Sequence, residues 1–198
     1  MKKIVAIGPE STGKSTLCEQ LAAYYHALWC PEYAREYVLK HGMDYTYDDL
    51  LIIAKGQLEL EEKIEAEAKS RELEKQNESI HSPITNSQSP IPSSLLFIDT
   101  DMYVMKVWCE YVFRKCHQFI PDNIAKRKYD LYLLCNIDLP WIKDELREYP
   151  DEQTRKELYF IYKNLLINQQ TPWVEISGAY EERLQKAIEA VGLYCMNP

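Results

Sequence analysis

Eight consecutive residues near the amino terminus have the types and spacing of a phosphate-binding loop. Residues 8–15 read GPESTGKS and match G-x-x-x-x-G-K-[ST] at every fixed position. Two glycines let such a backbone curl, so that consecutive N–H groups point inward at polyphosphate, and the following helix adds its positive end. The pattern predicts that ATP with Mg²⁺ binds at Gly8, Pro9, Glu10, Ser11, Thr12, Gly13, Lys14, Ser15 and Thr16.

Two side chains of this loop and two later acids have the chemistry of phosphoryl transfer. Lys14 would bridge the β- and γ-phosphates, and the Ser15 hydroxyl would bind Mg²⁺. Asp99 follows the apolar run 95–98 and is our second expected metal residue. If the chain stays extended, Asp101 faces the same side, and one of the two acids would act as general base. The structural alternative for Asp101 is a cap on the following helix.

A polar segment at about 139–156 has the character of a lid. Phosphoryl transfer needs positive charge that closes over the phosphates and excludes water. Lys143, Arg147 and Arg155 supply that charge, and Pro150 interrupts the segment. We expect Arg147 and Arg155 to act in catalysis; the alternative is that they are solvated surface residues.

An acidic and basic pair beside aromatic residues indicates an acceptor site. Glu32 and Arg35 are three residues apart in the run EYARE, which places them on one helix face. Such a pair can orient a sugar or a base, and an ordinary surface salt bridge is the alternative. We expect substrate binding by Glu32, Tyr33, Arg35, Asp101 and Tyr103.

The elements that must position these residues alternate along the chain. Buried strands alternating with amphipathic helices predict an α/β fold with a mostly parallel sheet covered on both faces. We expect strands at residues 3–7, 95–98, 129–135 and 172–176, a further strand ending before residue 32, and helices at 15–28, 32–39, 48–78, 102–113, 180–191 and, broken near residue 150, at 139–168.

Two neighbouring stretches stand outside this alternation. Residues 57–78 hold eight acids and four bases, which predicts a solvated helix with i,i+4 ion pairs. Residues 79–94 hold six serines and three prolines but no Asp, Glu, Lys or Arg, which predicts a flexible surface insertion.

The composition limits the class of protein. The chain has 198 residues with 23 basic and 31 acidic side chains, a net charge of −8, so we expect one domain over residues 1–198 and no general attraction to nucleic acid or an anionic membrane. Six cysteines without C-x-x-C spacing indicate free thiols. With no signal peptide or span of about 18 apolar residues, the expected location is cytoplasmic.

The motifs together resemble the ribosylnicotinamide kinase domain family, within the P-loop nucleoside and nucleotide kinases and the AAA-type ATP-binding domains. The resemblance covers residues 3 to about 191 and is carried by GPESTGKST, EYAREY, FIDTD and the spacing W-x-x-D-x-x-R in the lid. It implies a P-loop NTPase fold, with a five-stranded parallel sheet of order 2-3-1-4-5. The activity it implies is ATP-dependent phosphorylation of the ribose 5′-hydroxyl of nicotinamide riboside, giving nicotinamide mononucleotide.

The resemblance also implies roles for individual residues. It places adenine at the loop that contains Ser177, Gly178 and Tyr180. Members that bind the pyridine ring carry a Trp directly before the Glu-Tyr pair, where this chain has Pro31; Trp29, two residues earlier, would reach the same face. The chain starts at the phosphate-loop strand, so we expect no adenylyltransferase or DNA-binding domain before it.

Three functions remain open from the sequence. The first is a MgATP-dependent kinase of nicotinamide riboside, and the second is a kinase of another nucleoside or nucleotide. The third is an ATP-binding switch with slow or no transfer, whose partner surface would be the acidic helix and the serine-rich insertion. The oligomeric state is not indicated.

Overall fold

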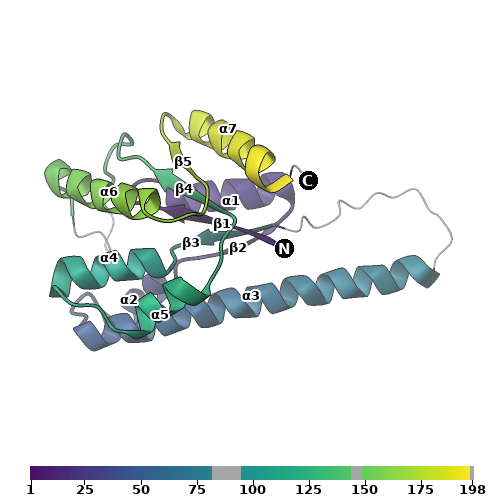
Figure 1. Cartoon of the computed structure of the whole chain (residues 1–198), viewed down its shortest axis with the longest axis horizontal. Coiled ribbons are helices and arrows are strands. Elements are labelled where there is room, and N and C mark those ends of the chain that lie inside the picture. Colours follow the sequence, from purple (N-terminus) through teal and green to yellow (C-terminus); the bar gives the residue numbers. More distant parts are fainter. Residues whose placement is uncertain (82–94, 144–148, 197–198) are drawn as a thin grey trace.

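Twelve helices and strands, followed by a short π-helix, build the described part of the chain (Figure 1). The computed structural model describes residues 1–81, 95–143 and 149–196, with only the helical backbone for 71–81. The elements are β1 (Lys2–Ile7), α1 (Lys14–Tyr25), β2 (Leu28–Cys30), α2 (Tyr33–His41), α3 (Tyr47–His81), β3 (Leu95–Asp99), α4 (Met102–Phe113), α5 (Phe119–Lys126), β4 (Leu131–Cys135), α6 (Glu152–Ile167), β5 (Trp173–Ile176), α7 (Tyr180–Val191) and a π-helix (Gly192–Met196).

The five strands form one parallel sheet in the order β2-β3-β1-β4-β5, which confirms the expected order. In this register Ala6 of β1 lies beside Asp99 of β3 and Leu133 of β4. The carboxyl ends of the central strands therefore meet at one edge, where ligands bind in open α/β sheets. This edge carries the phosphate loop.

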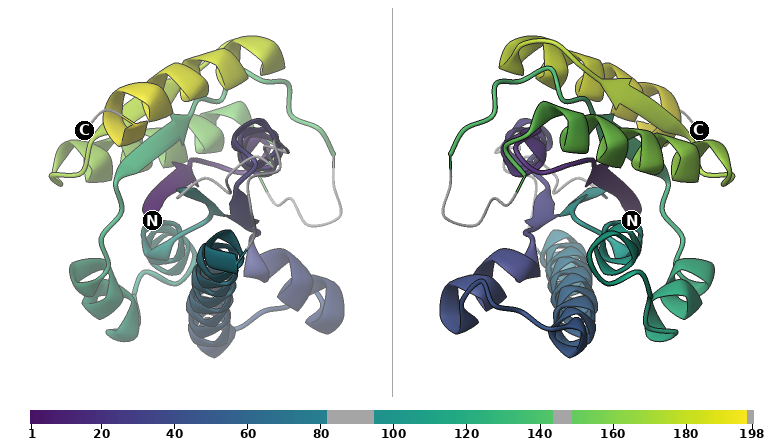
Figure 2. Two further views of the ribbon diagram at one scale, coloured as in Figure 1. Left: turned by 90° about the vertical axis from the view of Figure 1, so that its right-hand side faces the viewer. Right: turned by 90° about the vertical axis from the view of Figure 1, so that its left-hand side faces the viewer.

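Helices cover both faces of the sheet (Figure 2), and alternating side chains of the strands fill a core on each face. Ile4 and Ala6 point to the face covered by α1 and α7, and Val5 and Ile7 point to the face covered by α4 and α6. A third cluster joins α2, α3, α4 and α5. The central strands β1 (from Ile4), β3 and β4 are buried on both faces, which explains why they read as continuous apolar runs, whereas the edge strands β2 and β5 are mostly half-buried.

The expectation that residues 57–78 form a solvated helix is wrong for part of α3, which packs against the sheet. Glu61 of α3 is fully buried and pairs with Lys3 on β1 at 3.1 Å and with Arg127 at 3.0 Å. Tyr129 also donates a hydrogen bond to this carboxylate at 3.1 Å, and Glu65 pairs with Lys3 at 2.9 Å. These ion pairs fasten α3 to the sheet and to the segment that enters β4.

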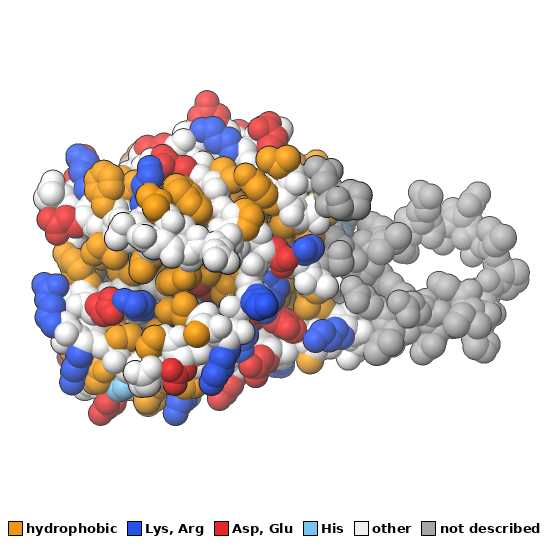
Figure 3. Space-filling model, viewed as in Figure 1, with side chains coloured by type: hydrophobic (Ala, Val, Ile, Leu, Met, Phe, Trp, Pro, Cys, Tyr) orange, Lys and Arg blue, Asp and Glu red, His pale blue; other side chains and the backbone are white. Residues whose placement is uncertain are grey.

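The described surface shows no separation of charged from apolar side chains on the face drawn in Figure 3. On the face shown in Figure 3, basic, acidic and apolar side chains are interspersed. No helix among the described residues is both long and apolar enough to span a lipid bilayer. All six cysteines are free.

The helical expectation was wrong at one place and missed two helices. The described residues 139–143 are not helical, and the helix after them is α6, which begins at Glu152 beyond the expected break. Helix α5 and the π-helix were not predicted at all. Of the expected insertion at 79–94, residues 79–81 still belong to α3, and 82–94 lie outside the described residues.

Candidate functional site

The phosphate loop curls because three of its residues adopt left-handed or otherwise positive backbone angles. Gly8 has φ +146°, and a Cβ there would lie 2.7 Å from the carbonyl oxygen of Cys135. Gly13 has φ +76° at the start of α1, and Ser11 has φ +56°. Glycine is required at residue 8 because the end of β4 leaves no room for a side chain. The backbone of this loop therefore has the form that a phosphate nest needs.

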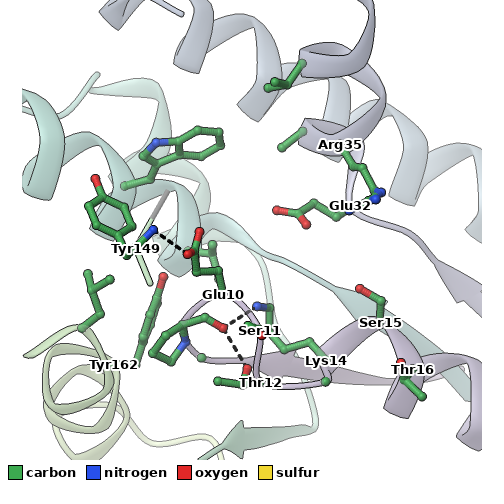
Figure 4. Close-up of a pocket in the computed structure, with 18 of the residues that line it drawn as sticks. Glu10, Ser11, Thr12, Lys14, Ser15, Thr16, Glu32, Arg35, Tyr149 and Tyr162 are labelled. Atoms are coloured by element: carbon green, nitrogen blue, oxygen red, sulfur yellow. Dashed lines mark hydrogen bonds between the residues drawn. The ribbon is translucent and has the colours of Figure 1, made fainter. Parts of the chain in front are cut away.

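The side chains of the loop are arranged around the Pro9 carbonyl and the end of β3. The Lys14 ammonium and the Thr12 hydroxyl both donate to the Pro9 oxygen, at 2.9 and 2.8 Å (Figure 4). The Ser15 hydroxyl donates to Asp99 Oδ2 at 2.5 Å. The structure thus brings the predicted lysine, serine and acid together, although Ser15 and Asp99 are 84 residues apart.

This serine and acid fit a magnesium ion. Asp99 is fully buried, and its Oδ1 has no hydrogen-bond partner among the described residues. Burial raises the pKa of Asp99, whereas Lys14 and the Ser15 hydrogen bond oppose the rise. A hydroxyl and a carboxylate oxygen are ligands that Mg²⁺ prefers, with the rest supplied by phosphates and water. The described residues contain no cluster of three or more metal-ligating side chains.

Asp101 does not share this arrangement. The expected extended chain is broken at Thr100, which has φ +80°. Asp101 Oδ1 accepts from the backbone N–H groups of Tyr103 and Val104, at 2.9 and 3.3 Å, and caps α4. Its Oδ2 accepts from the Tyr132 hydroxyl at 2.8 Å. Burial raises the pKa of Asp101 to about 6, and these hydrogen bonds oppose the rise. The geometry is that of the helix cap.

One cavity of about 440 Å³ continues from the phosphate loop into a second chamber (Figure 4). This volume is typical of small-molecule sites. All of residues 8–16 line the cavity. The second chamber is bounded by side chains from α2, α4, α6 and the loops between them: Glu32, Ala34, Arg35, Val38, Met43, Tyr45, Val104, Trp108, Tyr149, Leu158 and Tyr162.

Helix α3 positions Glu32 at the wall of this cavity. Gln57 is buried and accepts a hydrogen bond from the Tyr33 N–H at 2.7 Å, while its amide donates to the Pro31 carbonyl at 3.2 Å. The Tyr33 ring packs on Gly56, where an added Cβ would lie 2.2 Å from the ring. Burial raises the pKa of Glu32 to about 7, with a further rise from Asp99. A carboxylate with this pKa can exchange protons near neutral pH.

The described parts of the expected lid contact the phosphate loop directly. The backbone N–H of Tyr149 donates to Glu10 at 2.6 Å, and the Ile142 N–H donates to the Ser11 hydroxyl at 3.1 Å. Arg155 is buried in α6, and its guanidinium donates to the Ser11 carbonyl at 3.5 Å. Lys143 is exposed. Arg147 lies outside the described residues.

A buried arginine that the sequence analysis missed completes the nucleotide side. Arg183 of α7 donates to the carbonyls of Thr12 and Gly178, at 2.9 and 2.8 Å. It also donates to the Asn136 carbonyl at 2.8 Å and pairs with Asp138. The guanidinium therefore joins the phosphate loop to the end of β4 and to the turn before α7. In sequence it resembles any solvated helical arginine, so no local signal could have identified it.

Comparison with known proteins places the chain in a family. A family model described as an AAA domain matches residues 3–183. The chain belongs to this AAA-domain family. The phosphate loop, Asp99 and Arg183 all fall within the matched part of the AAA domain.

Two curated proteins are similar to this AAA domain over nearly its whole length. The trifunctional NAD biosynthesis/regulator protein NadR of Escherichia coli (strain K12) is 26% identical over 196 residues, and that of Salmonella typhimurium (strain LT2) is 25% identical. Each alignment covers 96% of this chain and 42% of the relative. The chain thus spans less than half the length of these relatives.

Two solved structures share the fold. A crystal structure of NadR protein in complex with NR superposes with a TM-score of 0.70 at 21% identity, covering all of this chain and 51% of that chain. Another, in complex with NAD and AMP-PNP, gives a TM-score of 0.65 at 23% identity, covering all of this chain and 50% of that chain. Both confirm the fold of the AAA domain.

Some of the predicted site residues line the cavity of the AAA domain, and others lie outside it. Glu32 and Arg35 line the second chamber, but Tyr33 and Tyr103 do not. Tyr180 lies beside the phosphate loop, since a Cβ at Gly13 would be 3.6 Å from its ring. Ser177 accepts a hydrogen bond from Lys186 at 2.9 Å and does not line the cavity.

The tryptophan expected at the acceptor site is a different one. Trp29 packs in the core between the sheet and α1 and α7, whereas Trp108 of α4 lines the second chamber. The Trp108 indole donates to the Tyr45 hydroxyl at 2.8 Å, and the two rings meet edge to face at 5.0 Å. Trp108 falls on the amphipathic pattern of α4, so its sequence context indicated only a core position.

Proposed function

We propose that this domain is a MgATP-dependent kinase that phosphorylates the ribose 5′-hydroxyl of nicotinamide riboside to nicotinamide mononucleotide. The observation that carries the proposal is the continuous cavity, which has a phosphate-binding loop at one end and a second chamber at the other. A donor and an acceptor bound in one cavity are held in the proximity that transfer requires. We also propose that residues 1–198 form a single domain.

ATP is the proposed donor. The loop supplies backbone N–H groups and Lys14 for the phosphates, and Ser15 and Asp99 would hold Mg²⁺, which neutralises phosphate charge when bound. Ser177, Gly178 and Tyr180 are the proposed adenine side. Arg155 and Arg147 are the proposed lid arginines. The solved NadR structure with NAD and AMP-PNP supports this assignment, because it pairs the same fold with an ATP analogue.

The second chamber suits an aromatic, cationic acceptor. Trp108, Tyr45, Tyr149 and Tyr162 line it, and Glu32 adds a carboxylate. A pyridinium ring is flat and positively charged, so aromatic faces and a nearby acid attract it. The NadR structure in complex with NR, the abbreviation for nicotinamide riboside, supports the same acceptor.

We assign the proton-accepting role to Glu32, in place of Asp101. Glu32 lines the cavity that holds Lys14, whereas both oxygens of Asp101 are engaged with α4 and Tyr132. In the proposed step the 5′-oxygen forms a bond to the γ-phosphorus as its proton passes to Glu32. The bond from that phosphorus to the oxygen bridging the β- and γ-phosphates breaks, and ADP leaves.

The test measures ADP formation by the purified protein with MgATP and a panel of acceptors. The panel contains nicotinamide riboside, the common nucleosides and their monophosphates, and product identity is checked by chromatography. We expect nicotinamide riboside to stimulate ATP consumption most. Stimulation by another nucleoside alone would replace our acceptor and keep the kinase. Tight ATP binding with no stimulation by any acceptor would favour the regulatory switch.

A further inference from the structure

The phosphate loop carries a carboxylate, Glu10, whose negative charge would repel a bound phosphate group. Glu10 occupies a variable position of G-x-x-x-x-G-K-[ST], where phosphate binding asks nothing of the side chain. A negative charge beside polyphosphate is repulsive, by about 1 kcal/mol or more at 4 Å depending on the local dielectric. The carboxylate therefore needs a role other than binding phosphate.

The contacts of Glu10 indicate that role. Its Oε1 accepts a hydrogen bond of 2.6 Å from the backbone N–H of Tyr149 and one of 3.4 Å from the Trp141 indole. Hydrogen bonds to an ionised acceptor are roughly twice as strong as neutral ones. One side chain of the loop thus holds two residues more than 130 positions away.

The neighbouring residue of the loop makes a parallel contact. The Ser11 hydroxyl accepts from the Ile142 N–H at 3.1 Å, and Ser11 has φ +56°. A non-glycine residue in this conformation is strained and persists only where its surroundings require it. Residues 10 and 11 therefore both use their side chains to fasten the segment that follows β4.

Tyr149 connects this fastening to the acceptor chamber. Its side chain lines the cavity and meets the Tyr111 ring edge to face at 5.7 Å. Figure 4 shows Tyr149 bound to Glu10 on one side of the cavity, with Glu32 and Arg35 on the other. Glu10 of the phosphate loop thus helps to fix the position of Tyr149 in the cavity wall.

We propose that Glu10 is a positioning residue for the acceptor: its carboxylate holds Tyr149 and Trp141, and so fixes the wall of the acceptor chamber from within the phosphate loop. The inference rests on the proposed kinase function for its activity readout. It makes Glu10 a determinant of acceptor affinity although the residue belongs to the ATP-binding motif.

The first test separates the acceptor KM from the ATP KM. Glu10→Ala should raise the acceptor KM about tenfold, the effect of losing a hydrogen bond to a charged group, while the ATP KM stays within about threefold. Glu10→Gln keeps an acceptor oxygen and should stay within about threefold for both substrates. Glu19→Ala, which removes the same charge from an exposed position on α1, is the matched control.

A second measurement does not depend on any acceptor. Hydrogen exchange at the Tyr149 amide should be faster by about tenfold or more in Glu10→Ala, because its bonding partner is lost. Exchange in Glu19→Ala should match the wild type, and exchange in Glu10→Gln, which keeps an acceptor oxygen without the charge, should lie between the wild type and Glu10→Ala. The activity arm uses whichever acceptor of the panel the wild type phosphorylates, so failure of nicotinamide riboside alone refutes only the proposed substrate.

Two results would overturn the inference. The first is Glu10→Ala with wild-type exchange at Tyr149. The second is a Glu10→Ala variant whose ATP KM rises while its acceptor KM stays unchanged. That result would show that Glu10 contributes to ATP binding and not to the acceptor chamber. If no acceptor supports turnover in the wild type, the exchange measurement decides the inference by itself.

Discussion

The two ends of the cavity are built in different ways. The phosphate end is made by nine consecutive residues, 8–16, and mostly by their backbone. The acceptor end is made by side chains from α2, α4, α6 and three loops, which the chain brings together over more than 100 residues. A local backbone site tolerates variation in the surrounding fold, whereas the acceptor end depends on the packing of every element that contributes a side chain.

The largest effect expected from this contrast is at the phosphate end. Lys14→Ala should lower kcat by about a thousandfold, because it removes charge stabilisation at the transferring phosphate. The measurement is steady-state ADP formation at saturating MgATP and acceptor. Lys126→Ala, at an exposed lysine of α5 that does not line the cavity, is the control. A Lys14→Ala variant with wild-type turnover would remove the phosphate-loop mechanism.

Proton transfer at the acceptor end should follow in size. Glu32→Gln should lower kcat by about a hundredfold, within the range of general-base catalysis. The active form of Glu32 is the carboxylate and its pKa is about 7, so kcat/KM of the wild type should fall as the pH drops through 7 and level off above it.

The pH profile supplies the control for this assignment. Glu32→Gln should lose the fall near pH 7, whereas Glu36→Gln, at an exposed acid of the same helix α2, should keep it. An unchanged profile in Glu32→Gln would exclude Glu32 as the titrating base.

The aromatic wall should affect binding more than chemistry. Trp108→Leu should raise the acceptor KM about tenfold and leave the ATP KM within about twofold, because stacking and cation–π contacts stabilise the bound ring. Trp108→Phe keeps an aromatic face and should recover most of the affinity. Equal losses for both substrates would show that Trp108 supports the whole cavity and not its acceptor end.

The smallest effect on turnover is expected at Asp101. Asn is as good a helix cap as Asp, so Asp101→Asn should keep kcat within about threefold. Asp101→Ala should lower the free energy of unfolding by about 1–3 kcal/mol, since it removes the cap of α4 and the partner of Tyr132. Denaturant unfolding measures the second change. A hundredfold loss of kcat in Asp101→Asn would return the general-base role to this residue.

The contrast also explains what could be predicted from the sequence. The phosphate loop and the strand before Asp99 are local patterns, and the sheet order came with the family resemblance, so all three were anticipated. The buried Glu61 was not, because its basic partners Lys3 and Arg127 are distant in sequence. The break at Thr100 and the choice of Trp108 over Trp29 depend on tertiary packing, which no spacing rule encodes.

Arg183 adds a consequence for the order of synthesis. The phosphate motif at residues 8–15 leaves the ribosome before α7, yet the Thr12 carbonyl in its middle is held by a guanidinium from that helix. Chains fold during synthesis from the amino terminus onward. Residues 8–15 therefore emerge before α7 is available to bind the Thr12 carbonyl. The backbone of the phosphate loop gains this partner only when a helix more than 160 residues later in the sequence has been made.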